Sequence, residues 1–420
     1  MKGTKPLVID KRNVFDAYKR VKHNGGSAGI DNVSIKDYTE HMSDNLYKLW
    51  NRMSSGTYFP KPVKLVEIPK SNGKKRPLGI PTVEDRIAQM AAVIVIETQI
   101  ESCFHKDSYG YRPQKSAHDA VATAQKRCFK YAWVLDMDIS SFFDTINHDL
   151  LMKAVRKHVT DKWVLLYIER WLKVPYQTHD NQLVQRAMGV PQGSVIGPIL
   201  ANLFLHYVFD KWMEINYPHI PFERYADDTI CHCNTEKECK DLLAVIKERF
   251  TQCHLRLNEE KTKIVFCKTS RRKGHYEQTS FDFLGFTFRP RGAKDRKNNM
   301  LFTSFLPAIS KKSRNSIAIA IKDWHLSKLL HRPMSEIAVL IEPQVRGWIQ
   351  YYSRFGKTEF WKVMRHLNNA LSYWLRKKRK KLRNKSVIGA YYMLAVIAKK
   401  HPTTFYHWRV GYIPYHKAKG

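Results

Sequence analysis

The sequence predicts an α+β body followed by an all-α C-terminal part. Over roughly the first 300 residues, short β-rich runs such as "YAWVLDMDIS" alternate with helical patterns, an order typical of α+β domains. After about residue 310 the strand signals stop, and patterns such as "EIAVLIEPQVRGWIQYYSRF" are helical. No Asp or Glu follows Glu359, so we expect the last helices to end in a strongly basic segment.

The expected elements follow one another without an internal repeat or a long linker. The first ~60 residues are mainly helical, interrupted by the turn-rich "HNGGSAGIDNVS". Two strands, "VKLVEIPK" and "KRPLGIP", flank a turn at residues 71–73. Next come helices at residues 84–101 and in "SAHDAVATAQKRCF", the strand "YAWVLDMDIS", the helix "FFDTINHDLLMKAVRKH", the strand–turn–strand "FERYADDTICHC", the helix "KECKDLLAVIKERFTQCHL", and the strands "KIVF" and "FDFLGFTF".

The charge of the chain points to a polyanionic partner. Lys and Arg total 72 against 38 Asp and Glu, a net charge of +34, and in the C-terminal part aromatic residues lie among the cations ("SYWLRKK", "FYHWRV"). Cations neutralise phosphates and aromatic rings stack on bases, so nucleic-acid binding is expected, although a basic run can also be a solvated face. No long apolar run and no signal peptide is present, and the seven cysteines include no C-x-x-C pair. These features favour a cytoplasmic protein that does not bind membranes.

Two acidic sites in β-rich surroundings suggest a metal centre. In "VLDMDISSFFD" the strand period places Asp136 and Asp138 on one face, and Asp227 and Asp228 lie in the turn of "RYADDT". An isolated "ADD" is more often a polar turn, but two such sites that meet would offer the oxygen ligands that Mg²⁺ prefers. We expect Asp138 and Asp227 to make the main bridge between two Mg²⁺ ions suited to phosphoryl transfer, with Asp228 in support.

Several motifs in one order resemble the group II intron-encoded reverse transcriptase/maturase family. "DMDISSFFD", "GVPQGSVIGPILAN" and "RYADD" resemble the palm of reverse transcriptases, and "GSAGIDNVSI", "RPLGIPTVEDRIAQ", "DSYGYRPQKSAHDAV", "FDFLGFTFRPR" and "VRGWIQYYSRF" resemble this family in particular. The resemblance implies a right-hand polymerase-like fingers and palm region over residues 1–300, an all-α thumb/maturase domain over 301–375, and a basic nucleic-acid-binding segment over 376–420. It also implies an RNA-directed DNA polymerase that binds group II intron RNA, an RNA template with a DNA primer, a DNA target and dNTPs.

The resemblance also assigns roles to individual residues. Asp138, Asp227 and Asp228 match the catalytic, metal-binding triad of a two-Mg²⁺ site. Lys70 and Arg76 match cations that hold the incoming triphosphate, with a plain surface hairpin as the alternative. Phe143 matches the gate under the sugar that excludes ribonucleotides, and is otherwise an ordinary core residue. Gln192 in "PQG" and Lys261 match further nucleotide contacts, and for Arg112 a structural ion pair is an equal alternative. Backbone contacts to nucleic acid are expected from Arg376, Lys377, Lys378, Arg379, Lys380 and Lys381.

One visible departure from the family pattern concerns the loop after "PQG". The family usually has a second Gly there and a Ser before the next Pro, whereas this chain has Ser194 and Gly197. Added bulk at Ser194 could alter template or primer handling, so two alternatives to an active polymerase stay open: a maturase that only assists splicing, and a reverse transcriptase adapted to host defence. Since no Cys follows Cys267, we also predict no H-N-H endonuclease domain. The oligomeric state is left open.

Overall fold

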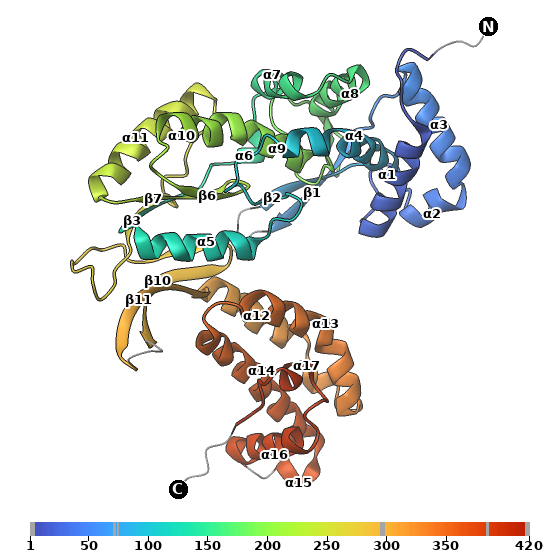
Figure 1. The fold of residues 1–420 in the computed structure, drawn as a ribbon. Coiled ribbons are helices and arrows are strands. Elements are labelled where there is room, and N and C mark those ends of the chain that lie inside the picture. The colour runs from blue at the N-terminus through green and yellow to red at the C-terminus, as the bar shows by residue number, and fades with distance from the viewer. Residues whose placement is uncertain (1–4, 70–72, 74, 295–298, 384–385, 416–420) are drawn as a thin grey trace. The chain divides into compact units, whose positions relative to one another are not determined.

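The computed structural model describes residues 5–69, 73, 75–294, 299–383 and 386–415. Contacts divide the chain into two units: Met1–Ala120 with Leu135–Ile264, and Val121–Val134 with Val265–Gly420. The predicted α+β body with an all-α continuation is confirmed, because every described strand ends by Ile309 and the elements described after it are helices (Figure 1). Among the described residues, no helix is both long and apolar enough to cross a membrane.

The first unit is built from helices packed on short strands. Most residues of helix α4 are buried, among them the polar Asp85, Arg86 and Gln89. The residue before the helix, Thr82, caps it, because its side chain accepts a hydrogen bond from the Asp85 amide. The helix bounds are α1 (Lys11–Asn24), α2 (Ile35–Glu40), α3 (Met42–Ser55), α4 (Val83–Glu101), α6 (Phe142–Thr145), α7 (His148–His158), α8 (Lys162–Lys173), α9 (Gly197–Leu205), the π-helix η1 (His206–Asp210), α10 (Lys211–Asn216) and α11 (Glu236–Gln252). Helix α5 (Ala117–Lys130) runs from the first unit into the second.

Two four-stranded sheets carry the predicted motifs. One has the order β2-β1-β4-β5 and contains the expected hairpin of β1 (Val63–Pro69) and β2 (Lys75–Ile80), joined by β4 (Tyr176–Gln177) and β5 (Leu183–Val184). The other has the order β6-β7-β3-β8, with β6 (Phe222–Tyr225) and β7 (Asp228–Cys233) antiparallel. Strands β3 (Trp133–Met137) and β8 (Lys263–Phe266) contribute residues to both units. This second sheet positions both acidic motifs.

The second unit pairs a three-stranded sheet with a helical core. Strands β9 (Phe281–Phe283), β10 (Phe286–Lys294) and β11 (Leu301–Ile309) lie in the order β11-β10-β9. The core includes Phe360, Leu367 and Trp374 of one long helix, together with Leu394 and Trp408 further along the chain. The helices are α12 (Lys311–Asp323), the 3-10 helix η2 (Leu326–Lys328), α13 (Met334–Tyr352), α14 (Lys357–Lys378), α15 (Lys380–Arg383), α16 (Val387–Lys400) and α17 (Tyr406–Arg409).

Residues 289–294, just before the predicted boundary at residue 300, form strand. Strand β10 continues to Lys294, paired with Leu301 of β11, because the alternation of buried Phe286 and Phe288 with exposed Arg289 extends a half-buried strand. The predicted boundary at residues 300–301 therefore falls at the start of β11. The predicted boundary at residues 375–376 falls inside α14.

Candidate catalytic site

Asp138 lies directly after the buried strand β3, where the chain leaves the sheet. Its backbone carbonyl accepts a hydrogen bond from the Asn258 amide at 2.8 Å, and the next residue, Ile139, forms an antiparallel bridge with Leu257. Lys261, on the same neighbouring segment, donates from Nζ to both carboxylate oxygens of Asp138 at 2.9 Å. The segment 257–261 thus fixes the backbone of Asp138 and brings a cation to its carboxylate.

Asp227 lies in the tight turn between β6 and β7. Tyr225 pairs with Asp228 across the turn, and Ala226 takes a left-handed backbone, φ +56°. Asp227 is half-buried whereas Asp228 is exposed, so the two neighbours differ in environment, as their opposite directions in a hairpin predict. Burial raises the pKa of Asp227, the negative charge of Asp138 raises it further, and Arg76 and Lys261 lower it. The structure therefore brings Asp138 and Asp227 into one electrostatic environment.

A buried arginine, Arg224, connects this turn to the core through its hydrogen bonds. Arg224 of β6 is fully buried and donates to both carboxylate oxygens of Asp210, at 2.6 and 2.5 Å. Its remaining hydrogen bonds reach the Asn202 side chain at 3.0 Å, the Ser108 hydroxyl at 2.8 Å and the carbonyl of Ala226 at 3.1 Å. A buried guanidinium needs such a complete set of partners. The last bond ties the turn that carries Asp227 to the core.

Sequence reasoning did not identify this network. Asp210 lies at the end of the π-helix η1, a local helix distortion that occurs often at functional sites, and Asn202 lies on α9. The sequence did offer one signal, since two charged residues, Glu223 and Arg224, follow one another within the strand "FERY". A buried charge on a strand needs a partner elsewhere in the fold. The identity of the partners depends on the packing of distant elements, which the pattern does not show.

Arg76 and Gln192, both predicted nucleotide contacts, meet beside Asp144. Arg76 Nε donates to Gln192 Oε1 at 2.5 Å, and Gln192 Nε2 lies 3.4 Å from Asp144 Oδ2. The "PQG" loop approaches β2 closely, since the Gly79 amide donates to the Gln192 carbonyl at 2.7 Å. A Cβ at Gly193, where φ is +108°, would lie 2.5 Å from the Gly79 carbonyl oxygen. Only glycine fits this position without a backbone shift.

The remaining predicted contacts have different outcomes. Lys70 lies outside the described residues. Phe143 is 9% exposed, and its ring packs edge-on against Phe142. Its role as the gate under the sugar stays a prediction. Arg112 is engaged structurally: its guanidinium donates to Glu101 at 2.7 Å and to the carbonyls of His105 and Ser108. The structural ion pair that was the equal alternative is therefore present, and it leaves the Arg112 side chain only 6% exposed. The nucleotide contact of Arg112 stays a prediction.

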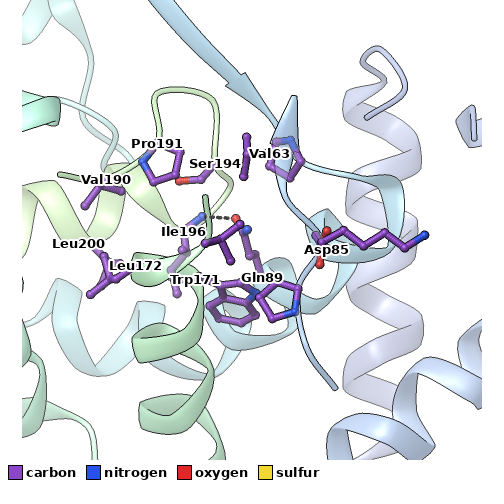
Figure 2. A pocket seen from close by; sticks show the side chains of 14 residues that line it. Val63, Asp85, Gln89, Trp171, Leu172, Val190, Pro191, Ser194, Ile196 and Leu200 are labelled. Atoms are coloured by element: carbon purple, nitrogen blue, oxygen red, sulfur yellow. Dashed lines mark hydrogen bonds between the residues drawn. The ribbon is translucent and has the colours of Figure 1, made fainter. Parts of the chain in front are cut away.

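Ser194 and Gly197, the two residues that depart from the family pattern, lie against one another in the fold. Ser194 is 7% exposed, so its side chain is directed into the protein. A Cβ at Gly197 would lie 2.5 Å from the Ser194 hydroxyl oxygen. Gln89 fixes the loop between them, since its Oε1 accepts from the Val195 amide at 2.8 Å. The same oxygen accepts from the Ile196 amide at 3.4 Å (Figure 2). The expected bulk of Ser194 thus fills the volume that Gly197 leaves vacant.

The predicted basic cluster lies at the end of α14 and in α15. Lys377, Arg379, Lys380 and Lys381 are exposed, which leaves their charges accessible to a polyanion. Lys378 differs, because its Nζ donates to the carbonyls of Leu330 and Arg332 at 2.7 Å and so fixes the loop after η2. Arg376 is half-buried and donates to the Arg383 carbonyl at 3.3 Å.

No ready-made metal cage is present in the described part of the chain: no three His, Cys, Asp or Glu side chains there group as metal ligands. The donor chemistry nevertheless suits a hard divalent cation, because Asp138 and Asp227 are oxygen ligands whose charges act on one another. A cation between them would relieve the repulsion that raises the pKa of Asp227. At present the Lys261 ammonium partly serves that purpose for Asp138.

The sheet and the turn lie within a region that matches the reverse transcriptase family. Residues 68–288, just over half of the chain, match the family described as reverse transcriptase (RNA-dependent DNA polymerase). Residues 314–392 match the group II intron, maturase-specific domain. The chain therefore belongs to the group II intron-encoded reverse transcriptase/maturase family, which confirms the resemblance seen in its motifs.

Two relatives, YkfC and LtrA, show the same relationship. Protein YkfC of Escherichia coli (strain K12) is 32% identical over 335 residues, covering 69% of this chain and 82% of YkfC. The group II intron-encoded protein LtrA of Lactococcus lactis subsp. cremoris is 30% identical over 262 residues, covering 62% of this chain but only 42% of LtrA. A telomerase from Candida albicans, solved with a TWJ fragment of telomeric RNA, aligns with a TM-score of 0.47 and 11% identity over 90% of this chain and 68% of that chain.

Proposed function

We propose that this protein is an active RNA-directed DNA polymerase that also binds group II intron RNA to assist splicing and mobility. The observation that supports the polymerase activity is the juxtaposition of Asp138 and Asp227. Lys261 holds the carboxylate of Asp138, and the hydrogen bonds of Arg224 hold the turn that carries Asp227. Two carboxylates whose repulsion is relieved by cations match the requirements of nucleotidyl transfer. We place this activity in the cytoplasm.

In this proposal Asp138 and Asp227 would hold two Mg²⁺ ions, with the exposed Asp228 as a supporting ligand. The ions would supply charge neutralisation at the phosphate that is transferred. Arg76 and Lys261 provide the protein's own cations near the carboxylates, since the charge of each lowers the pKa of Asp227. Arg76 is held by Gln192 at 2.5 Å, so it is positioned for a triphosphate before the substrate arrives.

The substrates follow from the charge and the family. An RNA template with a DNA primer, together with dNTPs, would use the carboxylate site, and Phe143 would select against ribonucleotides. Intron RNA and a DNA target would contact the exposed cations Lys377, Arg379, Lys380 and Lys381, whose charges would make binding strongly dependent on salt. Assistance to splicing depends on this second surface and not on the carboxylates.

Primer extension on a long RNA template with Mg²⁺ and dNTPs tests the polymerase. The wild type should extend the primer and Asp227→Asn should not, because the variant loses a charged ligand. Asp16→Asn, on an exposed position of α1 that pairs only with Lys19 in the described contacts, is the matched control and should extend like the wild type. If the wild type binds the template but does not extend the primer, the polymerase proposal is wrong, and splicing assistance becomes the leading function.

A splicing assay separates the two roles. Stimulation of intron splicing should survive Asp227→Asn but fall when Lys377, Arg379, Lys380 and Lys381 are replaced together by Gln. Equal loss in both variants would show that splicing assistance is not carried by the basic cluster alone.

A further inference from the structure

Tyr111 combines a strained backbone with an exposed aromatic ring. Its φ is +55° although it is not a glycine, and 56% of its surface is exposed. A left-handed backbone costs a bulky residue free energy and persists at functional sites, where the surroundings enforce it. Two other residues with this backbone lie next to the carboxylates: Ser141 (φ +47°), three residues after Asp138, and Ala226 (φ +56°), directly before Asp227.

The backbone next to Tyr111 is fixed by Arg224 and Asn202, two residues of the hydrogen-bond network that holds the turn of Asp227. The residue two positions earlier, Tyr109, donates from its amide to the carbonyl of Arg224 at 2.8 Å. The carbonyl of Gly110 accepts from Asn202 Nδ2 at 2.6 Å, and a Cβ at Gly110 would lie 2.5 Å from the Ala226 amide nitrogen. Tyr111 is therefore presented on a rigid base that touches the turn of Asp227.

The ring of Tyr111 lies near the turn that carries Asp227 and Asp228. Its centroid is 6.4 Å from that of Tyr225, at an interplanar angle of 45°, and Tyr225 pairs with Asp228 across the turn. Burial raises the pKa of Tyr111, the charges of Asp227 and Asp228 raise it further, and the charge of Arg76 lowers it. These influences place the phenol among the charged groups of the site, while the exposed part of the ring stays accessible to a ligand.

We propose that Tyr111 is a contact residue that stacks on the terminal nucleotide of the primer. This inference rests on the polymerase activity proposed above. A triphosphate is bound by cations, which Arg76 and Lys261 supply, whereas an uncharged ring gains most from a base or a sugar. The attacking hydroxyl belongs to the end of the primer, so that nucleotide must lie beside Asp138 and Asp227 when it reacts. A rigid ring next to the same turn would hold it there.

Fluorescence of a primer that ends in 2-aminopurine, annealed to an RNA template and bound in EDTA, tests stacking without catalysis. The wild type should quench the terminal 2-aminopurine. Tyr111→Phe, which keeps the ring, should quench it equally, and Tyr111→Ala should lose most of the quenching. Alanine keeps a Cβ and therefore the same backbone requirement. Tyr47→Ala, a tyrosine of equal 56% exposure on α3, is the control and should behave like the wild type.

Single-nucleotide extension provides the second measurement. Tyr111→Ala should lower the maximal rate about tenfold, the scale of one lost stacking contact, without changing the KM for the dNTP. Tyr111→Leu keeps the bulk of the side chain and gives the same comparison if the alanine variant does not fold.

The outcomes are distinct. Equal quenching by the wild type and Tyr111→Ala, or no quenching by the wild type, overturns the proposal. A higher KM for the dNTP with unchanged quenching also overturns it, because the ring would then contact the incoming nucleotide. Quenching by the wild type and its loss in Tyr111→Ala, without any extension by the wild type, would support the contact while refuting the polymerase activity.

Discussion

The shared volume of Ser194 and Gly197 predicts that substitutions at these two positions are energetically coupled. Gly197→Ala places a Cβ 2.5 Å from the Ser194 hydroxyl oxygen and 3.1 Å from Val190 Cγ1. Overpacking of this kind costs about 1–3 kcal/mol. Gly197 opens α9 without a positive φ, so alanine meets no backbone penalty there and the clash is its main cost.

Ser194→Ala removes the oxygen that causes the clash. That oxygen is buried and has no hydrogen-bond partner among the described residues, so its loss alone should change the free energy of unfolding by less than about 1 kcal/mol. The double variant should recover about 1–2 kcal/mol relative to the sum of the single variants. Urea unfolding of the four proteins measures this coupling, and primer extension should follow the same order.

Additive effects in this cycle would refute the argument. They would mean that the Ser194 hydroxyl rotates away or that the loop moves at no cost, so that the two residues do not share one volume. A lower extension rate in Ser194→Ala with unchanged stability would instead show that the buried hydroxyl affects the reaction without affecting the stability of the fold.

Two further predictions concern buried charge. Arg224→Met leaves the Asp210 carboxylate buried without its partner. It should lower the free energy of unfolding of the first unit by about 3–5 kcal/mol and abolish primer extension. The double variant Arg224→Met with Asp210→Leu should recover part of the stability, and no recovery would contradict the proposed pairing. Burial lowers the pKa of His407 to about 3, so the folded chain keeps this side chain neutral while the unfolded chain takes up a proton near pH 6.5. Stability should therefore fall by about 2 kcal/mol between pH 7 and pH 5. Thermal unfolding of His407→Gln should show a correspondingly weaker pH dependence, and an unchanged dependence would exclude His407 as its source.

The sequence predicted the positions that chemistry constrains most. Asp138 and Asp227 were expected together because a carboxylate at the end of a buried strand needs a compensating group, and the β-rich flanks of "RYADDT" indicated the hairpin. The non-equivalence of Asp227 and Asp228 followed from the alternation of side chains along a strand. These features depend on local pattern, which the sequence carries directly.

Features that depend on distant packing were not predictable in the same way. Arg112 has the same sequence signal whether it meets Glu101 or a nucleotide, and only the fold shows the carboxylate beside it. Strands β4 and β5 have two residues each, too few for any periodicity to show. In β10 the cationic residues concealed a strand, because charge on the solvent face resembles the composition of a loop.

The end of the second unit affects how the protein can be shortened in the laboratory. Asn368 of α14 accepts hydrogen bonds from His407 and Trp408, both at 2.9 Å, and donates to the carbonyl of Tyr412 at 3.1 Å. Trp408 also belongs to the hydrophobic core that surrounds α14. A deletion that begins near residue 405 would therefore open this core while leaving every exposed cation of α14 and α15 in the chain. Weak RNA binding by such a truncated protein would report misfolding, and charge substitutions in the full-length chain are the more informative way to map its RNA contacts.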